Sequence, residues 1–590
     1  MTEPAQRSMA PLLLLVTLSG GASLGIEVVA ARVLGRTMGS TSGSIAAVLA
    51  GVLGGMGLGA FVAERWIIER APRPLLGYAL CELLSALLAV VFLAGAPGFG
   101  TVLRLGGAEA LLVMAVALVA LPWGATFPFL VRSVSGAPGA IRRIYGWNAV
   151  GGAAGAVLCG LAGIPFLGEW GALLVCAALQ VTACAGAVVL SGGQSSSSVE
   201  RAAGGSLEPP RSVALAALLF STGFLVFYWE VLWARILTLT VGSTVYSFSV
   251  ITGAVVLGTG LGSLWVPLGR RGRAVPLLAA FFCAALHPAV PRFADAYLFG
   301  VRAFGASPLV WGTLSAGAVA FVPNFLLGCL FPWALGFAPD RAGRLYAWNA
   351  AGCIAGAFAG GPLGAQVLGL EPAYAAGVLG LGLLGGAMLL PAARPGRIAA
   401  LASTLALSIL FVPVAAGSWS VWDPLRLLSG VYQWSRADLE SLPLAESLES
   451  RKVLLVEPGR EVIVTVELER DANTVYVRGN GKVEGGVPAD LGKPSIADLP
   501  TQVLLGALPA LIAGKGIDSP ALLIGFGSGV TLGALAGPRG FSLEAVDVIE
   551  IEEAFVRAVT SERVASYFKP FLPPALFDGA SSVQARFHFG

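Results

Sequence analysis

The chain has 590 residues, of which 56% are hydrophobic and 12% are charged, and its formal net charge is +3. Charged residues make up roughly a quarter of an ordinary soluble protein, so this composition excludes a soluble globular protein and indicates a multi-pass protein of the cell (inner) membrane. The arginines are spread through short loops and form no basic cluster, so we expect the lipid bilayer as a partner and no nucleic acid.

Apolar segments long enough to cross a bilayer, about twenty residues each, run through the first two thirds of the chain. A first set of six lies near residues 10–34, 43–64, 74–97, 107–132, 145–167 and 170–190. A second set lies near residues 212–238, 244–268, 274–290, 306–335, 345–368 and 372–392, and a thirteenth candidate covers 398–417. The fold class predicted for this part is therefore a polytopic α-helical membrane domain.

Short motifs recur between the two sets at a nearly constant offset. Glu27 and Arg32 return as Glu230 and Arg235, and the run that contains Tyr145 and Trp147 returns with Tyr346 and Trp348. We therefore predict two six-helix repeats, residues 1–191 and 212–392, joined by a polar linker at 192–211 and followed by an additional helix at 393–417. Six is even, so both repeats enter the membrane from the same side, a parallel arrangement found in some transporters.

Glu27 and Glu230 are the candidate functional residues of the membrane part. A carboxylate inside a spanning segment is costly and usually faces a charged partner, a cavity or a substrate path. Arg32 and Arg235 lie five residues further on, so each either pairs with its glutamate or marks the membrane boundary. A cation-binding or transport role for the carboxylates is the alternative to such a pair. Aromatic residues at the helix starts are predicted to anchor the interface: Tyr145, Trp147, Tyr346 and Trp348.

The remaining chemistry of the membrane part is sparse. All seven cysteines lie in or beside apolar segments, and the only histidines are His287 and His588, so we expect no metal. Loops on one side carry more arginines, among them Arg142 and Arg344, and that side should be cytoplasmic. Thirteen spans would then place the C-terminal part outside the cell, where a nucleoside cofactor is not expected, so its side stays open.

Beyond residue 417 the pattern changes to short β-branched runs. Residues 418–500 are predicted as a β-rich lead with an antiparallel meander. Residues 501–590 continue with a helix, a strand at 521–524, a turn containing Gly525, Gly527 and Gly529, and a strand that ends at Glu550. A glycine-rich turn admits a nucleoside closely and an acid at the next strand end can bind ribose. We expect an incomplete Rossmann-like domain of the α/β methyltransferase type.

Five motifs in order resemble the spermidine synthase family, and most closely its membrane-fused bacterial branch. They begin at Trp422, Asn480, Asp498, Gly525 and Glu550. The resemblance implies a polyamine aminopropyltransferase that uses decarboxylated S-adenosylmethionine as co-substrate and a polyamine such as putrescine as acceptor. It further implies cofactor contacts from the glycine turn and Glu550, and a substrate site near Asp498 and Gln502.

The sequence departs from that family at two places. Ser528 stands where family members carry an acidic residue, and the chain ends before the strand that bears their catalytic acid, so no catalytic residue is expected and the chain is predicted to be a truncated, inactive fragment. Two alternatives remain open at this point. One is a transporter-like membrane protein with a nucleoside- or polyamine-sensing domain, and the other is an S-adenosylmethionine-dependent methyltransferase-like enzyme. A homo-oligomer stays open as well.

Overall fold

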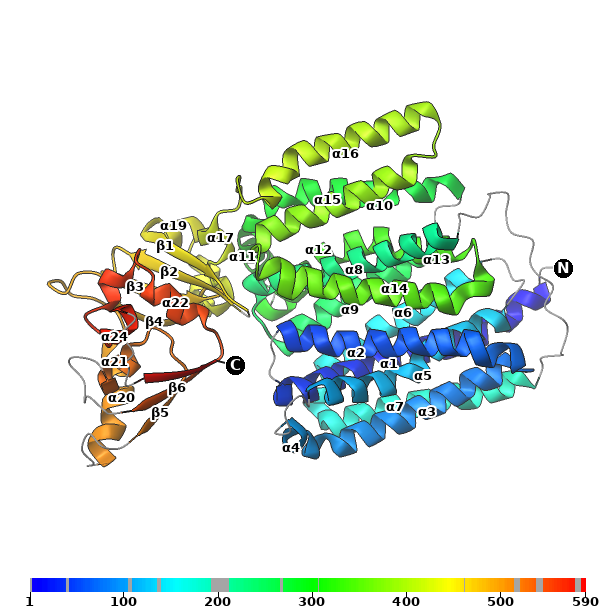
Figure 1. The fold of residues 1–590 in the computed structure, drawn as a ribbon, viewed down its shortest axis with the longest axis horizontal. Helices are drawn as coiled ribbons and strands as arrows, with labels where there is room; N and C mark the ends of the chain where they lie inside the picture. The colour runs from blue at the N-terminus through cyan, green and yellow to red at the C-terminus, as the bar shows by residue number, and fades with distance from the viewer. Residues whose placement is uncertain are drawn as a thin grey trace. The chain divides into compact units, whose positions relative to one another are not determined.

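The computed structural model describes residues 3–38, 42–103, 109–134, 139–192, 212–265, 269–305, 307–460, 462–513, 520–536, 545–578 and 585–589 (Figure 1). The predicted linker at 192–211 lies outside the described residues except for its first residue. Contacts divide the chain into two compact units. The first, the helical unit, comprises residues 1–238, 243–287 and 312–420, and the second, the mixed unit, comprises residues 239–242, 288–311 and 421–590.

The helical unit consists of helices, most of them long and lying side by side (Figure 1). In chain order they are α1 (Glu3–Met38), α2 (Ser42–Val62), α3 (Pro74–Gly95), α4 (Phe99–Leu103), α5 (Glu109–Ser133), α6 (Ala140–Leu158), α7 (Ile164–Ser191), α8 (Ser212–Val241), α9 (Val245–Leu264), α10 (Val275–Leu286), α12 (Pro308–Gly328), α13 (Leu330–Leu335), α14 (Ala342–Gly360), α15 (Leu370–Leu389) and α16 (Arg394–Ala415).

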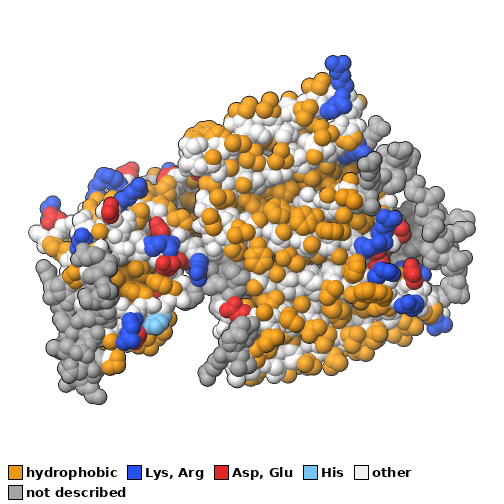
Figure 2. Space-filling view, in the orientation of Figure 1, with side chains coloured by type: hydrophobic (Ala, Val, Ile, Leu, Met, Phe, Trp, Pro, Cys, Tyr) orange, Lys and Arg blue, Asp and Glu red, His pale blue; other side chains and the backbone are white. Residues whose placement is uncertain are grey.

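Within the described residues, eleven helical runs are long and apolar enough to cross a membrane. Large apolar side chains on their flanks are exposed, for example Leu118 at 60% and Ile409 at 66%, and Figure 2 shows hydrophobic side chains covering these flanks while charged ones gather toward the helix ends. Such a surface is stable only in lipid. The protein is therefore a multi-pass membrane protein embedded in a bilayer.

The eleven runs differ from the thirteen predicted spans at two places. The run Ala140–Ser191 contains two predicted spans, 145–167 and 170–190, and a π-helical turn at Cys159–Gly163 lies inside the first of them. A kink separates the two spans as predicted, because Gly168, which lies between them, adopts a non-helical φ of 69°. The predicted span at 345–368 is not among the eleven; its helix α14 consists largely of alanine and glycine.

Glycine contacts between helices occur at equivalent positions in the two halves of the helical unit. A Cβ atom added to Gly155 of α6 would lie 2.0 Å from the Gly21 carbonyl oxygen of α1, and one added to Gly356 of α14 would lie 2.1 Å from the Phe224 carbonyl oxygen of α8. The pairs α2–α5 and α9–α12 repeat this pattern. Backbones this close leave no room for a side chain, which is why these positions are glycine.

The two halves also pack against each other reciprocally. A Cβ atom on Gly57 of α2 would lie 3.0 Å from the Cβ atom of Ala350 on α14. A Cβ atom on Gly260 of α9 would lie 3.0 Å from the Cβ atom of Ala149 on α6. Each half therefore presents its second and its fifth long helix to the other half, so the contact between the halves has a local pseudo-twofold relation.

The mixed unit contains one helix that lies, along the chain, between two membrane helices. α11 (Phe293–Phe304) falls between two predicted spans and packs with the chain after residue 420. The Asp295 carboxylate lies 2.6 Å from the Arg426 guanidinium, and Arg302 donates from Nε to the Leu439 carbonyl oxygen at 2.8 Å. Three short helices belong to the same segment: α17 (Pro424–Leu427), α18 (Arg436–Ser441) and α19 (Leu444–Glu449).

The β-rich part of the mixed unit is present as predicted. β1 (Arg451–Pro458), β2 (Ile463–Glu469), β3 (Thr474–Gly479) and β4 (Lys482–Pro488) form an antiparallel sheet in the order β1-β2-β3-β4. Alternating valines such as Val464 and Val466 are fully buried on the inner face. Asn473 and Asn480 adopt positive φ angles in the turns, which asparagine tolerates better than most residues.

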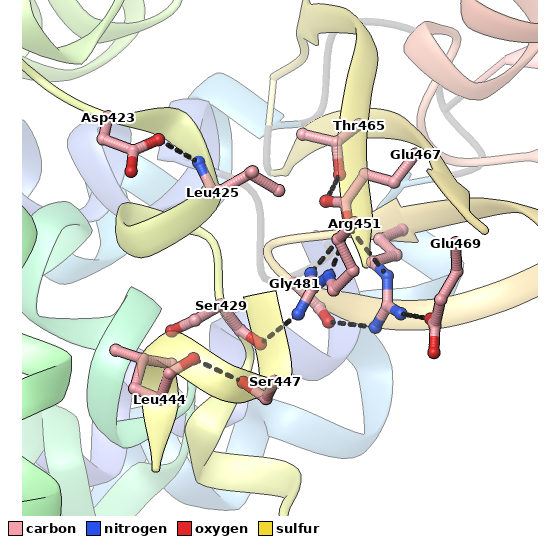
Figure 3. Close-up of polar contacts among 11 residues, drawn as sticks. Asp423, Leu425, Ser429, Leu444, Ser447, Arg451, Thr465, Glu467, Glu469 and Gly481 are labelled. Carbon is pink, nitrogen blue, oxygen red and sulfur yellow. Dashed lines mark hydrogen bonds and ion pairs between the residues drawn. The ribbon is translucent and has the colours of Figure 1, made fainter. Parts of the chain in front are cut away.

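A buried ion-pair network crosses this sheet (Figure 3). Glu467 is 1% exposed and its Oε2 atom lies 2.6 Å from Nη2 of Arg451 and 3.2 Å from Nε of Arg478. Its Oε1 atom accepts a hydrogen bond from the Thr465 hydroxyl at 2.7 Å. Arg478 reaches Glu469 as well, at 3.4 Å. Two arginines thus share one buried carboxylate.

A three-stranded parallel sheet follows, with the order β5-β6-β7. Its strands are β5 (Ala521–Ile524), β6 (Val546–Glu550) and β7 (Ala585–Phe589), and its helices are α20 (Leu499–Ala513), α21 (Val530–Ala536), α22 (Ala554–Thr560), α23 (Ala565–Phe568) and α24 (Ala575–Asp578). One sheet face is buried through Val546 and Val548. The other exposes Leu522, Ile524 and Ile549 to 60%, 77% and 42%.

Candidate functional site

The two glutamates predicted inside spans occupy equivalent places in the structure. Glu27 lies on α1 and Glu230 on α8, and both side chains are only partly buried. The two carboxylates are close enough to interact electrostatically. Within the part of the chain that the structure describes, neither carboxylate has a hydrogen-bond or ion-pair partner. Two carboxylates, one from each half, therefore lie near each other without a counter-charge in the described chain.

Arg32 forms an ion pair with a residue other than Glu27, the partner suggested by the sequence. Its Nε atom lies 3.0 Å from Oε1 of Glu169 on α7, and Arg36 lies 2.6 Å from Oε2 of the same carboxylate. The pairing of Arg32 with Glu27 is therefore wrong, because residues five apart on a helix point to different faces. Arg235, the equivalent residue on α8, is partly buried.

A cluster of four aromatic rings joins the two halves near the carboxylates. It consists of Phe127 of α5, Tyr145 of α6, Phe331 of α13 and Tyr346 of α14. The ring centroids of Tyr145 and Phe331 are 4.8 Å apart, and those of Phe127 and Tyr346 are 5.4 Å apart. Each half supplies one phenylalanine and one tyrosine at equivalent positions. We call this group the aromatic cluster.

The predicted role of these tyrosines as interface anchors is wrong. α6 and α14 begin at Ala140 and Ala342, so each tyrosine lies a full turn inside its helix, where its ring packs between the halves. The neighbouring tryptophans are exposed, Trp147 at 40% and Trp348 at 52%, as an anchor requires. Tyr346 of the aromatic cluster lies within electrostatic range of Glu27.

A second contact between the halves is made by Glu64, which follows α2. Its Oε1 atom lies 2.7 Å from Nε of Arg344 on α14, and its Oε2 atom accepts hydrogen bonds from the backbone N–H groups of Gly343 and Arg344. A carboxylate at a helix N-terminus is stabilised both by the unpaired N–H groups and by the helix dipole. Glu64 therefore holds the start of α14 against α2.

In the mixed unit, the predicted glycine turn follows β5. Gly525, Gly527 and Gly529 have φ angles of 86°, 57° and 80°, values that favour glycine strongly. Glu550, at the end of β6, accepts hydrogen bonds from the backbone N–H groups of Phe526 at 2.6 Å and Glu552 at 2.8 Å. Both carboxylate oxygens of Glu550 thus hold the backbone of the turn and of the chain after β6.

Gln502 reaches the same turn, whereas Asp498 does not. The Gln502 amide donates to the carbonyl oxygens of Gly486 and Asp498, both at 3.0 Å, and accepts from the Ser528 hydroxyl. Gln502 therefore ties β4, α20 and the glycine turn together. The Asp498 side chain is exposed. Among the described residues, no three side chains of histidine, cysteine, aspartate or glutamate are grouped so that they could hold a metal ion.

Comparison with known proteins gives structural neighbours only. No family model matches the sequence, and no curated protein matches it. The nucleoside transporter NupG is 14% identical, with a TM-score of 0.33 over 68% of this chain and 98% of NupG, and a NupG mutant scores 0.35 over 67% and 98%. An inward-facing, unoccupied bacterial homologue of the human lysosomal transporter Spinster is also 14% identical, with a TM-score of 0.34 over 74% of this chain and all of that one. Similarity at this level does not establish a family, an activity or a substrate for this chain.

The comparisons overturn the assignment to the spermidine synthase family. The similar structures are membrane transporters, and no family model supports a synthase. The prediction of an aminopropyltransferase, and with it of polyamine biosynthesis, is therefore wrong. The structure supplies a physical reason, since Gln502, Ser528 and Glu550 make hydrogen bonds that build the turn itself. Short motifs of this kind serve local structure as well as a synthase site.

Proposed function

We propose that this protein is a membrane transporter of a cationic solute, with Glu27 and Glu230 as its central binding residues. The observation that carries the proposal is this pair of carboxylates, equivalent in the two halves, within electrostatic range and without a cationic partner in the described chain. A charge in a membrane interior is costly unless something neutralises it. A bound cation between the two carboxylates would supply that neutralisation.

The two parallel six-helix repeats predicted for the helical unit support this proposal. The sequence motifs recur in register, and the glycine contacts of α1 with α6 recur between α8 and α14. Transporters with internal repeats bind their substrates where the repeats meet. Glu27 and Glu230, one from each repeat and within electrostatic range of each other, would suit such a place. Movement of one repeat against the other would expose the carboxylates to either side in turn.

The aromatic cluster and the Glu64–Arg344 pair have a role in the same proposal. Both join the two repeats, and both lie where α5 ends and where α6 and α14 begin. This is the arginine-rich side predicted to be cytoplasmic. Four rings in contact leave no aqueous path between them, so the cluster acts as the closed gate on that side. Release toward the cytoplasm requires the rings to separate.

Uptake into proteoliposomes tests the binding role. The full chain is reconstituted, and radiolabelled putrescine and tetraethylammonium serve as a dicationic and a monocationic probe. We expect uptake of at least one probe, reduced about tenfold or more in Glu27→Gln and in Glu230→Gln, because tenfold corresponds to only about 1.4 kcal/mol of lost interaction. Glu109→Gln, an exposed glutamate at the start of α5, is the matched control. Unchanged uptake in the double variant Glu27→Gln/Glu230→Gln would refute the proposal.

For the mixed unit we propose a Rossmann-like domain that binds a nucleoside at the glycine turn and senses it. The supporting observation is Gly525, which is exposed and where an added Cβ atom would have no neighbour within 4 Å. A ligand has room to approach the backbone there. Adenosine binding to the full chain by calorimetry is the test, with loss expected in Gly525→Val. Binding that is absent in the unaltered chain would contradict this role.

A further inference from the structure

A buried polar cluster in the first half of the helical unit is not explained by the central carboxylates. Glu82 of α3 is 1% exposed, and its Oε1 atom accepts a hydrogen bond from the Ser19 hydroxyl of α1. Its Oε2 atom has no hydrogen-bond partner in the described part of the chain. Gln180 of α7 is 0% exposed, and neither its Oε1 nor its Nε2 atom has a partner there. Three buried polar atoms are thus left unsatisfied.

The packing of α1 against α7 places Gln180 at nearly the same height along the helices as Ser19 and its partner Glu82. A Cβ atom on Gly25 of α1 would meet Cys176 of α7, and one on Gly186 of α7 would meet Leu15 of α1. These two contacts fix an antiparallel register in which Gln180 lies within one helical turn of the level of Ser19, and Ser19 bonds directly to Glu82. Glu82 also interacts electrostatically with Cys184, one turn from Gln180. Glu82 and Gln180 therefore lie at about the same level of the packed helices α1, α3 and α7.

The titratable groups around Glu82 carry no positive charge. They are Tyr78 and Cys81 on its own helix and Cys184 on α7. No lysine, arginine or histidine of the described residues pairs with Glu82. The equivalent positions in the second half are Ala284 and Gly382, with Cys81 matching Cys283 and Glu169 matching Glu371. The cluster therefore exists in one half only, unlike the central pair.

A buried carboxylate without a counter-charge carries a large desolvation cost. A proton taken from water and bound to Oε2 removes that cost, and the resulting O–H group is a donor for the unsatisfied Oε1 atom of Gln180. Unlike a metal ion, a proton needs no shell of several ligands, so it fits between the closely packed helices α1, α3 and α7. We propose that Glu82 is a proton-binding site of the first half and that Gln180 is the acceptor of its proton. Its coupling to solute movement rests on the proposed function, whereas its protonation does not.

Infrared spectroscopy of the full chain in membranes tests the site directly. We expect a C=O stretching band of a protonated carboxylic acid at neutral pH that disappears in Glu82→Gln and changes frequency in Gln180→Leu, which removes the acceptor. Recording these spectra in the Glu27→Gln/Glu230→Gln background excludes bands from the central pair. Glu109→Gln is the matched control and leaves the band in place. If Glu82→Gln does not fold, the Gln180→Leu variant still tests the proposal, because loss of the acceptor should change the frequency of the carboxylic acid band.

Two outcomes would overturn the proposal. One is an infrared spectrum at neutral pH with no carboxylic acid band that depends on residue 82. The other is a melting temperature that rises with sodium chloride relative to choline chloride at equal ionic strength and loses this rise in Glu82→Gln, which would identify the ligand as a metal cation. Failure of the proposed function alone looks different, since cation uptake would be absent while the Glu82 band persists.

Discussion

At the scale of single residues, the partners of a glutamate decide what it does. Glu550 holds backbone N–H groups and so builds a turn. Glu467 compensates two buried arginines. Glu27 lies in a membrane helix without either kind of partner in the described chain, which is why it is a candidate for binding. The same side chain thus has three roles, and the surroundings separate them.

The Arg451–Glu467–Arg478 network predicts a large effect of one substitution. Burial, and secondly the nearby Arg451, lower the pKa of the Arg478 guanidinium, so this side chain depends on the Glu467 charge. In Glu467→Ala two buried arginines lose their counter-charge, which costs about 3–5 kcal/mol. We expect the amides of β1 to β3 to exchange hydrogen about a hundredfold faster or more, measured by hydrogen–deuterium exchange on the full chain.

A matched variant separates burial from charge in that experiment. Glu440 is 57% exposed and pairs with Arg436 on α18. An exposed pair of this kind contributes about 0–1 kcal/mol, so Glu440→Ala should leave exchange in β1 to β3 unchanged. Equal effects of the two substitutions would show that the buried network does not stabilise the sheet.

A pH dependence is expected at the parallel sheet. The hydrogen bond from His588, 3.0 Å away, and secondly the Arg586 guanidinium hold the pKa of the Asp547 carboxyl below its usual range. Because the pKa is lower in the folded than in the unfolded chain, the contribution to stability is present above a pH of about 4 and is lost as the pH falls through the lowered pKa.

Hydrogen exchange of β7 as a function of pH measures this contribution. Protection of β7, corrected for the intrinsic exchange rate, should fall below a pH of about 4 in the unaltered chain, and Asp547→Asn should remove that fall. A variant whose β7 protection still drops in the same acid range would assign the effect to another group.

At the scale of elements, close glycine contacts set the distances between helices. The carbonyl oxygens facing Gly155 and Gly356 would lie only 2.0 and 2.1 Å from an added Cβ atom, far inside van der Waals contact. Gly155→Ala and Gly356→Ala should therefore separate α1 from α6 and α8 from α14. Overpacking of this kind typically costs about 1–3 kcal/mol. Equal costs at the two positions would reflect the repeated architecture.

Thermal unfolding of the purified chain in detergent measures these costs. Gly100→Ala is the control, because a Cβ atom there would meet nothing within 4 Å. We expect melting temperatures below that of the unaltered chain for Gly155→Ala and Gly356→Ala, and no decrease for Gly100→Ala. If all three variants melt alike, the glycine contacts do not limit the helix distances.

At the scale of the whole molecule, the aromatic cluster predicts which side of the central carboxylates is closed. In Phe127→Ala/Phe331→Ala two of its four rings are removed. A cysteine placed at position 27 should then react about tenfold faster with a membrane-impermeant thiol reagent from the arginine-rich side. The measurement is a labelling rate in vesicles of each orientation, in a Cys184→Ser background, since Cys184 is the only described cysteine that is not buried.

The control for this prediction removes a ring of similar burial elsewhere. Phe92 is 8% exposed and packs on Phe99 with centroids 5.2 Å apart, within the first half alone. Phe92→Ala should leave the labelling rate unchanged. Faster labelling from the opposite side only would place the closed gate at the other end of the helical unit.

Sequence alone determined the features that depend on local pattern or on repetition. Apolar length identifies membrane helices because a bilayer has a fixed thickness, and β-branched alternation identified the meander. The offset between Gly124 and Gly328 also relates Phe127 to Phe331, so the repeat in the sequence contains a signal for the aromatic cluster. The π-helical turn at Cys159–Gly163 was not predictable in this way, because such a turn has no composition of its own.

Tertiary structure alone decided which distant residues meet. Arg32 is nearer in sequence to Glu27 but pairs with Glu169, and α11 packs with the chain after residue 420 although it follows a membrane helix. Glu82 and Gln180 became a pair only through the register of three helices. The motifs at Gln502 and Glu550 gave a wrong family because a sequence shows which polar groups are present, whereas only the fold shows which hydrogen bonds already satisfy them.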